Sequence, residues 1–453
     1  MNAEFYHAVH IDEQVCIGCS HCMSVCPTEA IRVRNGKARI LEEKCIDCGE
    51  CYRECPVSAI KVEENELGMI FNYKHRVALL PAIFTGQFPD EIKPLQIYSA
   101  LLQLGFTHVY EVEKSTGIVS ALQNKEIKDQ KRPKPFMSTF CPAIIRLIQV
   151  NFPLLLDNLI HVKPPVDIAA LYTRKDLETK GLKREDTGLF YITPCAAKIA
   201  AIKSPVGENQ SSINGVINMN SLFHQMQLKV KSAGIPAHAP DQVVGPEILW
   251  PLTGGERAKI KGSSLAIDGI KNVIAFLEKI ENEEINGVDF LELRACDQSC
   301  AGGILVPENK FLAAERLNRR AAANVVTTES LGEMKEYEQF LIENSQLQKL
   351  KPRSALKLDN DTTKAMEKMK RMRKIMCFLP GFDCGGCGSP TCQTLSEDIV
   401  QGNADISYCV FMQKVMQKNH KLSAEHALSI IEKIWGKQRL DKNCNKIGAD
   451  NDS

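Results

Sequence analysis

Four cysteines in three separate segments of this sequence have the spacing of a buried metal site. The segment 289–303 reads D-F-L-E-L-R-A-C-D-Q-S-C-A-G-G, so Cys296 and Cys300 follow a short apolar strand and precede two glycines. A pair of thiolates does not complete a metal site, so two further ligands must come from elsewhere. Cys141 in S-T-F-C-P and Cys195 in T-P-C-A-A-K are the candidates, since each lies beside a proline in an expected loop. Four cysteines converging from three segments favour a 4Fe-4S cluster in the core of the fold.

Two cysteine runs near the N-terminus share one spacing. Residues 16–27 read C-I-G-C-S-H-C-M-S-V-C-P and residues 45–56 read C-I-D-C-G-E-C-Y-R-E-C-P. Both are C-x-x-C-x-x-C-x-x-x-C-P, which is typical of bacterial two-cluster ferredoxins and disfavours zinc or disulfides. Each run leads into a short apolar strand, at 30–33 and 59–62, so the unit is an internal duplication, and His21 is expected at the surface without a ligand role. One cluster should be held by Cys16, Cys19, Cys22 and Cys55, and the second by Cys45, Cys48, Cys51 and Cys26.

A third kind of cysteine cluster lies near the C-terminus. Residues 384–392 read C-G-G-C-G-S-P-T-C, and Cys409 follows in an expected helix. The glycines allow backbone N–H groups to turn toward the sulfurs, which suits a 4Fe-4S cluster near solvent, with a zinc knuckle as the alternative. Cys377, expected to be buried beside this cluster, and Cys444 in a polar tail are left without a role. The sequence thus predicts four 4Fe-4S clusters, the last of them held by Cys384, Cys387, Cys392 and Cys409.

The elements that must position these cysteines alternate between strand and helix. Alternation of this kind predicts an α/β domain with a mostly parallel sheet and with the ligands on loops at its edge. Strands are expected at 77–80, 109–112 and 189–192, and helices at 96–104, from 144, over 312–348, over 364–376 and over 424–435.

A methionine stripe runs along the expected helix 364–376. Met366, Met369, Met372 and Met376 recur at helical spacing, with lysines and arginines opposite. Packing in a core or against another helix is the first interpretation, and a face for docking a partner is the alternative.

Composition limits the class of protein. The chain has 453 residues, a net charge of +1 and 18 cysteines. This balance predicts no attraction to nucleic acid, and the basic loop 128–135 is expected to be solvated. We expect no signal peptide and no membrane span, because no apolar run is long enough. Clustered cysteines in a large chain indicate metal binding in a reducing compartment, so a cytoplasmic location is expected.

The order of the motifs resembles that of a known family. The ferredoxin unit followed by S-T-F-C-P, T-P-C-A-A-K and the 289–303 segment is similar to the FeFe hydrogenases over residues 1 to about 310, and the 384–392 motif resembles a separate single-cluster module. The resemblance implies a two-cluster ferredoxin-like domain at 1–75, an FeFe-hydrogenase-like core at 76–348, a helical 4Fe-4S domain with its preceding helix at 349–415, and a helix and polar tail at 416–453.

The resemblance also implies roles for individual residues. Cys141, Cys195, Cys296 and Cys300 would bind the core 4Fe-4S cluster, and Cys300 would also bridge to a two-iron subsite that carries CO and cyanide. Lys198 matches the lysine that donates a hydrogen bond to a cyanide, with an ordinary salt bridge as the alternative. Cys300 and Lys198 are therefore the candidate catalytic residues, and Lys198 the candidate cofactor-binding side chain.

This sequence departs from the family where protons are handled. Phe140 stands where active enzymes carry a proton-relay cysteine, and Ala201 replaces a relay glutamate. Thr193 and Arg294 stand in place of pocket methionines. General acid–base steps are commonly worth roughly a hundredfold to ten-thousandfold in rate, so fast H2 turnover should be lost. A slow route through Arg294 or Glu292 stays open.

Three functions follow from the resemblance. The first is an iron–sulfur protein that binds H2 or senses redox state and passes electrons on, with little turnover. The second is a slow hydrogenase with a different proton route, and the third is an electron-transfer or scaffold protein without the two-iron subsite. The implied partners are a ferredoxin or flavoprotein or a separate signalling protein, maturation proteins if the subsite is present, and H2 or protons as ligand.

Overall fold

The computed structural model describes residues 5–128, 132–234, 243, 245–323, 332–353, 358–359 and 361–440. The chain forms two compact units, each of which combines segments that are distant in sequence. The core unit comprises Met1–Ala8, Ile46–Gly49 and Val62–Pro352. The second unit comprises Val9–Cys45, Glu50–Lys61 and Arg353–Ser453. The finer division into four domains stays a prediction.

A parallel four-stranded sheet organises the core unit, in the order β6-β5-β8-β9. All seven residues of β8 are buried, as expected of a central strand covered on both faces. A second parallel sheet has the order β10-β11-β7. The strands are β5 (His75–Leu80), β6 (His108–Glu111), β7 (Phe136–Met137), β8 (Thr187–Thr193), β9 (Gly215–Asn218), β10 (Ser264–Asp268) and β11 (Phe290–Arg294). The expected strands and the parallel sheet are confirmed.

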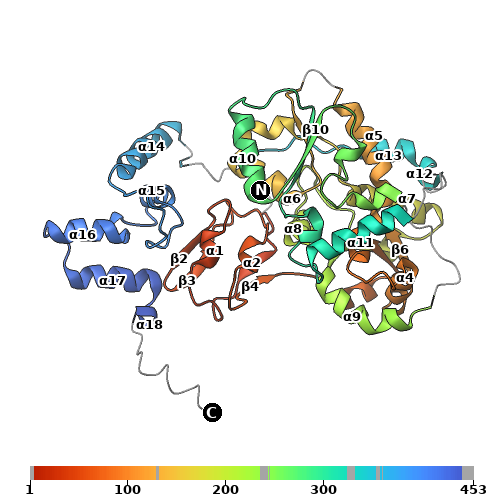
Figure 1. The fold of residues 1–453 in the computed structure, drawn as a ribbon, viewed down its shortest axis with the longest axis horizontal. Helices are drawn as coiled ribbons and strands as arrows, with labels where there is room; N and C mark the ends of the chain where they lie inside the picture. Colours follow the sequence, from red (N-terminus) through yellow and green to blue (C-terminus); the bar gives the residue numbers. More distant parts are fainter. Residues whose placement is uncertain are drawn as a thin grey trace, which may run out of the picture. The chain divides into compact units, whose positions relative to one another are not determined.

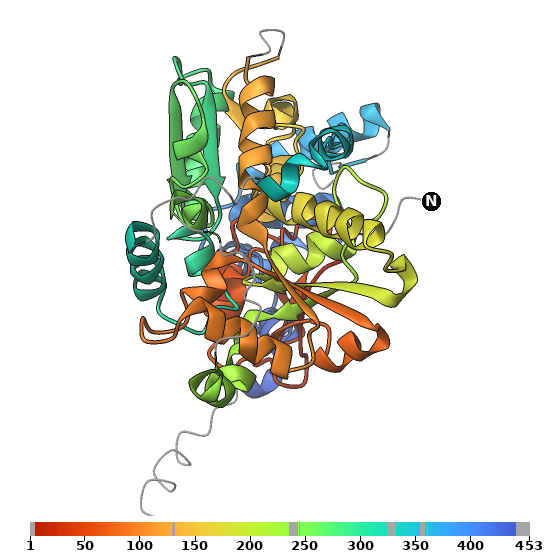
Figure 2. The ribbon, with the colours of Figure 1, turned by 90° about the vertical axis from the view of Figure 1, so that its right-hand side faces the viewer.

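Helices connect these strands and pack along them (Figure 2). The predicted helix over 312–348 is only partly correct, because α11 ends at Ala323, 324–331 lies outside the described residues, and no helix follows Asn344 up to residue 348. The helices are α3 (Ala82–Thr85), α4 (Pro94–Gln103), α5 (Thr116–Glu126), α6 (Pro142–Asn151), α7 (Pro165–Thr179), α8 (Ala196–Lys203), α9 (Met219–Ser232), α10 (Ile270–Glu281), α11 (Lys310–Ala323), α12 (Gly332–Lys335) and α13 (Glu338–Asn344).

The second unit contains the two N-terminal cysteine runs and the C-terminal helices. Its short strands β1 (Val9–Ile11), β2 (Ile31–Arg34), β3 (Lys37–Ile40) and β4 (Ile60–Val62) form the pairs β1–β4 and β2–β3. The helices are α1 (His21–Ser24), α2 (Glu50–Arg53), α14 (Thr362–Met376), α15 (Cys392–Val400), α16 (Val410–Lys418), α17 (Ala424–Trp435) and α18 (Lys437–Leu440), the last five drawn in blue in Figure 1. The predicted helix at 424–435 is confirmed, and His21 is exposed as expected.

Backbone hydrogen bonds join the N-terminal and C-terminal segments within this second unit. The Val33 amide donates to the Gly388 carbonyl at 2.8 Å, and the Gly36 amide donates to the Ile434 carbonyl at 2.9 Å. The indole N–H of Trp435 donates to the Gly386 carbonyl at 2.9 Å. The glycine-rich C-terminal motif therefore packs directly on β2.

Of two expectations about the C-terminal segment, one is partly correct and one is wrong. No residue of α14 is buried, and Met366 and Met369 are 57% and 43% exposed, so these two methionines are not core. The helix does pack against α15, as the alternative form of that interpretation expects, and Met372 is half-buried. Only the end of the stripe, at Met376, packs against the apolar cluster of the C-terminal cysteines. Cys377, the residue that follows the last turn of α14, is exposed, and Cys444 lies outside the described residues.

Among the described residues, no helix has both the length and the apolar composition needed to cross a bilayer.

Candidate metal centres

Four cysteines of the core unit line one cavity. Cys141 directly precedes α6 and Cys195 directly precedes α8, while Cys296 and Cys300 follow β11. The positive end of each helix dipole thus lies at a cysteine, which favours the thiolate form. The structure brings together the four cysteines that the sequence singled out, and their ligand role stays a prediction.

Gly302 and Gly303 must be glycines because other backbone segments pass very close to them. A Cβ atom at Gly303 would overlap the carbonyl oxygen of Pro194, and one at Gly302 would overlap the carbonyl oxygen of Asp297. The 296–303 turn can therefore fold tightly against the loop that carries Cys195 only with glycine at these positions.

Lys198 is a buried cation of this cavity. Its Nζ donates to the hydroxyl of Tyr191 at 3.2 Å and lies 3.8 Å from the Cys300 sulfur. Burial lowers the pKa of Lys198, but the adjacent Cys300 sulfur and Tyr191 oxygen, which favour a positive charge, outweigh burial, and the net pKa is raised. Lys198 therefore stays protonated and opposes the negative charge that thiolates bring to the site.

Phe140 closes the cavity with a ring that contacts two cations. The Nζ of Lys198 lies 4.2 Å from the ring centroid, and the guanidinium carbon of Arg294 lies 3.9 Å from it. Desolvated cation–π contacts are worth up to about 2 kcal/mol, so they hold the ring in place. The ring exchanges no proton and covers the position where a relay group is expected.

Arg294 is anchored from behind by two buried carboxylates. Its Nη2 donates to Glu256 at 2.9 Å and its Nε donates to Glu292 at 3.2 Å. The carboxylate of Glu292 also accepts from the backbone amides of Gly254 at 2.9 Å and Arg257 at 2.7 Å. Arg294 Nη1 has no acceptor among the described residues, although the side chain is nearly fully buried and lines the cavity.

The sequence did not identify Glu256 as part of this site. The only sequence feature near Glu256 was the weak Thr253-Gly254-Gly255 turn. A turn does not predict that the Glu256 carboxylate pairs with Arg294, which is 38 residues away in the chain. Glu292, which could have served a proton route, is instead fully engaged in holding Arg294 and the 254–257 turn.

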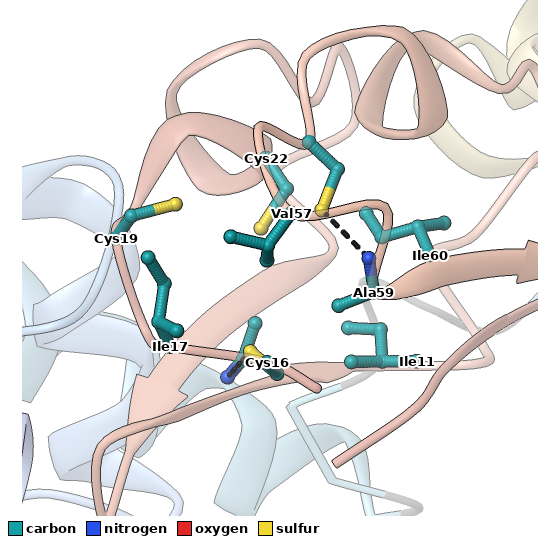
Figure 3. Close-up of a pocket in the computed structure, with 10 residues that line it drawn as sticks. Ile11, Cys16, Ile17, Cys19, Cys22, Val57, Ala59 and Ile60 are labelled. Carbon is teal, nitrogen blue, oxygen red and sulfur yellow. Dashed lines mark hydrogen bonds between the residues drawn. The ribbon is translucent and has the colours of Figure 1, made fainter. Parts of the chain in front are cut away.

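The first N-terminal cysteine set lines a second cavity, of about 310 Å³. Figure 3 shows Cys16, Cys19 and Cys22 around a common space walled by apolar side chains such as Ile11 and Ile60. The fourth predicted ligand, Cys55, lines the same cavity.

Backbone amides donate to sulfur in both N-terminal runs. The Ala30 amide lies 3.2 Å from the Cys26 sulfur, and the Ala59 amide lies 3.2 Å from the Cys55 sulfur. The identical i+4 geometry confirms the internal duplication. Of the second predicted set, Cys26, Cys45 and Cys51 lie in the second unit, and Cys48 lies in the 46–49 segment of the core unit.

The C-terminal cysteines line a third cavity, of about 280 Å³. Cys387, Cys392 and Cys409 are buried, whereas Cys384 is exposed. This arrangement agrees with the expectation of a cluster near solvent.

The chemistry of the three cavities fits iron–sulfur clusters. Burial, as the largest cause, raises the pKa of Cys195 and of Cys22 to about 12 and that of Cys387 to about 11. Such thiols ionise only when a cation compensates the charge, which a bound metal does. None of the described cysteines is in a disulfide.

The residues that line the core cavity include the four cysteines expected to hold a 4Fe-4S cluster. Phe140 and Arg294 line the remaining wall. Cys141, Cys195, Cys296 and Cys300 are thus suited to hold one 4Fe-4S cluster, and the two-iron subsite stays a prediction.

Three family models match the chain. Residues 74–255 match the model described as the iron-only hydrogenase large subunit, C-terminal domain. This match ends before Cys296 and Cys300. Residues 8–56 match the 4Fe-4S dicluster domain, and residues 379–411 match a model described as an Fe-S cluster.

Curated relatives are similar over part of their length. Iron hydrogenase 1 of Clostridium pasteurianum is 25% identical over 48% of this chain and 38% of its own. The NADP-reducing hydrogenase subunit HndD of Solidesulfovibrio fructosivorans is 23% identical over 62% of this chain and 47% of its own. The large subunit of the periplasmic iron hydrogenase of Nitratidesulfovibrio vulgaris is 28% identical over 55% of this chain and 66% of its own. The chain thus spans less than two thirds of the length of each of these relatives.

Among solved structures, a variant of the FeFe hydrogenase HydA1 from Chlamydomonas reinhardtii is similar with a TM-score of 0.47 and 15% identity, over 61% of this chain and 93% of that one. The family matches and the observed topology confirm the predicted fold class, a mixed α/β protein with an N-terminal ferredoxin-like domain and a hydrogenase-like core.

Proposed function

Because the chain is a divergent FeFe-hydrogenase-like protein, we propose that it passes electrons between 4Fe-4S clusters and a redox partner and reports redox state, with little turnover of H2. The partner is an electron carrier such as a ferredoxin or flavoprotein, or a separate signalling protein. The proposal includes a cytoplasmic location, because clusters held by many thiolates persist in a reducing compartment.

The observation that carries the proposal is the position of Phe140. Its ring contacts both Lys198 and Arg294 at the wall of the core cavity, where a proton relay would have to stand. Ala201, the second relay position, is likewise unable to exchange a proton. A site whose two relay positions carry side chains that exchange no proton loses the general acid–base catalysis that those positions would supply.

The test combines metal analysis with infrared spectroscopy on the full chain. The protein is reconstituted anaerobically with iron and sulfide and then incubated with a synthetic two-iron complex that carries CO and cyanide. We expect iron for four 4Fe-4S clusters, no CO or cyanide bands in the separated protein, and reversible reduction by dithionite. Bands that shift under H2 would contradict the proposal.

A second candidate, an H2-binding sensor or slow hydrogenase, is favoured by Lys198. A buried ammonium 3.8 Å from the Cys300 sulfur is suitably placed to bind an anionic ligand there. This candidate requires maturation proteins to supply the two-iron subsite. It predicts that Cys300→Ala abolishes an H2 response while the ferredoxin-type clusters remain. It also predicts that Phe140→Cys with Ala201→Glu raises H2 evolution in protein loaded with the two-iron complex.

A further inference from the structure

A set of exposed apolar side chains lies on the segments that carry the C-terminal cysteine site. It consists of Met366 and Met369 of α14, Phe378 and Phe382 of the following loop, and Phe411 of α16, and we call it the methionine–phenylalanine face. These side chains are 57%, 43%, 66%, 66% and 43% exposed, respectively. The rings of Phe382 and Phe411 are in contact, with centroids 5.2 Å apart. Exposed aromatic rings that pack on each other at the surface, as Phe382 and Phe411 do, are typical of an interaction site.

The helix that carries the two methionines is strongly basic. Between its bounds at Thr362 and Met376, α14 has six lysines and arginines and one acidic residue, Glu367. Among the described residues, Lys368 is the one of these six that pairs with a carboxylate, that of Asp359 at 3.0 Å. The other basic side chains are therefore available to an acidic surface.

The same part of the chain brings a cluster site to solvent. Cys384 is exposed, and it lies two residues after Phe382. A polar groove of about 650 Å³ is lined by Cys384 and by Cys26 of the first N-terminal run. A Cβ on Gly385 would lie 3.0 Å from the methyl carbon of Met23, which follows Cys22. Within the second unit, the C-terminal cysteine site thus adjoins the N-terminal cysteine sites.

We propose that the methionine–phenylalanine face and the basic side of α14 dock an acidic electron-carrier protein, and that electrons enter or leave through the cluster of Cys384. In the entering direction, one electron leaves the reduced centre of the carrier and the C-terminal cluster gains it, with no bond made or broken. Methionines suit this task because their flexible side chains adapt to a partner surface, and opposite charges speed the encounter. The inference rests on the proposed electron-transfer function and identifies its partner surface.

The experiment measures the rate at which a reduced, acidic plant-type ferredoxin reduces the reconstituted full chain, by stopped-flow absorbance at low salt. The double variant Lys370→Glu, Arg371→Glu reverses two charges on α14. The matched control, Lys229→Glu with Lys231→Glu, reverses two charges on α9 of the core unit. We expect a loss of about tenfold or more in the second-order rate for the α14 variant only, and a smaller difference at high ionic strength.

A second pair of variants tests the apolar contribution. Phe378→Ser removes an exposed ring of the face, and Leu228→Ser removes an 83% exposed apolar side chain from α9. Neither side chain is buried, so neither change is expected to affect folding. We expect slower reduction with Phe378→Ser and the unaltered rate with Leu228→Ser.

The alternatives give distinct results. Equal rates in both charge variants, or equal losses, would overturn the docking site. Sedimentation with phosphatidylglycerol vesicles that is lost in the α14 variant, with an unchanged rate toward ferredoxin, would also overturn it and identify a membrane-surface helix. Dithionite reduces clusters without docking, so failure of dithionite to reduce them would refute the proposed function itself, independently of the docking site.

Discussion

Asp398 joins two segments of the second unit that are more than 360 residues apart, and its replacement tests that connection. Its Oδ2 accepts hydrogen bonds from Arg32 Nε at 2.7 Å, Arg34 Nη2 at 3.0 Å and Ser389 Oγ at 2.8 Å. The carboxylate side chain is only 7% exposed. It therefore compensates two guanidinium groups of β2 next to the C-terminal cysteine motif.

The change Asp398→Asn keeps the shape and removes the charge. Breaking a buried ion pair from one side costs about 3–5 kcal/mol, because the remaining charge is left uncompensated. Arg32 keeps its bond to the Glu29 carbonyl at 2.7 Å, and Arg34 keeps its bond to the Gly388 carbonyl at 2.7 Å. Because these bonds survive, we expect the free energy of unfolding to fall by the lower end of this range, about 3 kcal/mol.

The assay is urea unfolding of the reconstituted protein under anaerobic conditions, followed by circular dichroism and cluster absorbance. With an m-value of about 3 kcal/mol/M, the transition of the second unit should shift by about 1 M. The matched control is Glu50→Gln, which removes a carboxylate from a partly exposed pair with Arg53 at 3.1 Å. Exposed pairs are worth about 0–1 kcal/mol, so its midpoint should barely move. A shift for Asp398→Asn no larger than that for Glu50→Gln would refute the reasoning.

Three further predictions concern the core and C-terminal sites. Arg294→Gln should lower the reduction potential of the core cluster by on the order of tens of millivolts, because a buried cation favours the more negative reduced state. The control Arg257→Gln, at an exposed site, should leave this potential unchanged, and both potentials are measured by an EPR-monitored redox titration. Cys384→Ala should remove one cluster by iron analysis while the EPR signals of the ferredoxin-type clusters persist, and loss of all clusters would contradict separate sites. Burial raises the pKa of Glu113 to about 8, so the folded state holds a proton that the unfolded chain releases near its ordinary value of 4.5. Stability should therefore fall as pH rises from about 5 to 8, and Glu113→Gln should flatten this dependence in urea midpoints; an equally steep dependence in the variant would contradict the assignment.

What the sequence determined by itself is local. The spacing of the N-terminal runs constrains three thiolates to one short turn, so the grouping of Cys16, Cys19 and Cys22 follows from chain geometry alone. The strand at 189–192 and the helix at 424–435 were predictable because their apolar residues recur with the period of one element.

Only the tertiary structure decided which faces are covered and which distant charges meet. The methionines of α14 have the period of a packed helix, but periodicity does not report whether another element covers them, and Met366 and Met369 lie in solvent. The pairing of Arg294 with Glu256 and the position of Phe140 against Lys198 arise because two separate parallel sheets meet at this site: Arg294 ends β11 and Phe140 follows β7 in one sheet, whereas Lys198 follows β8 of the other. Contacts between residues far apart in the chain depend on how elements pack, which no local pattern encodes.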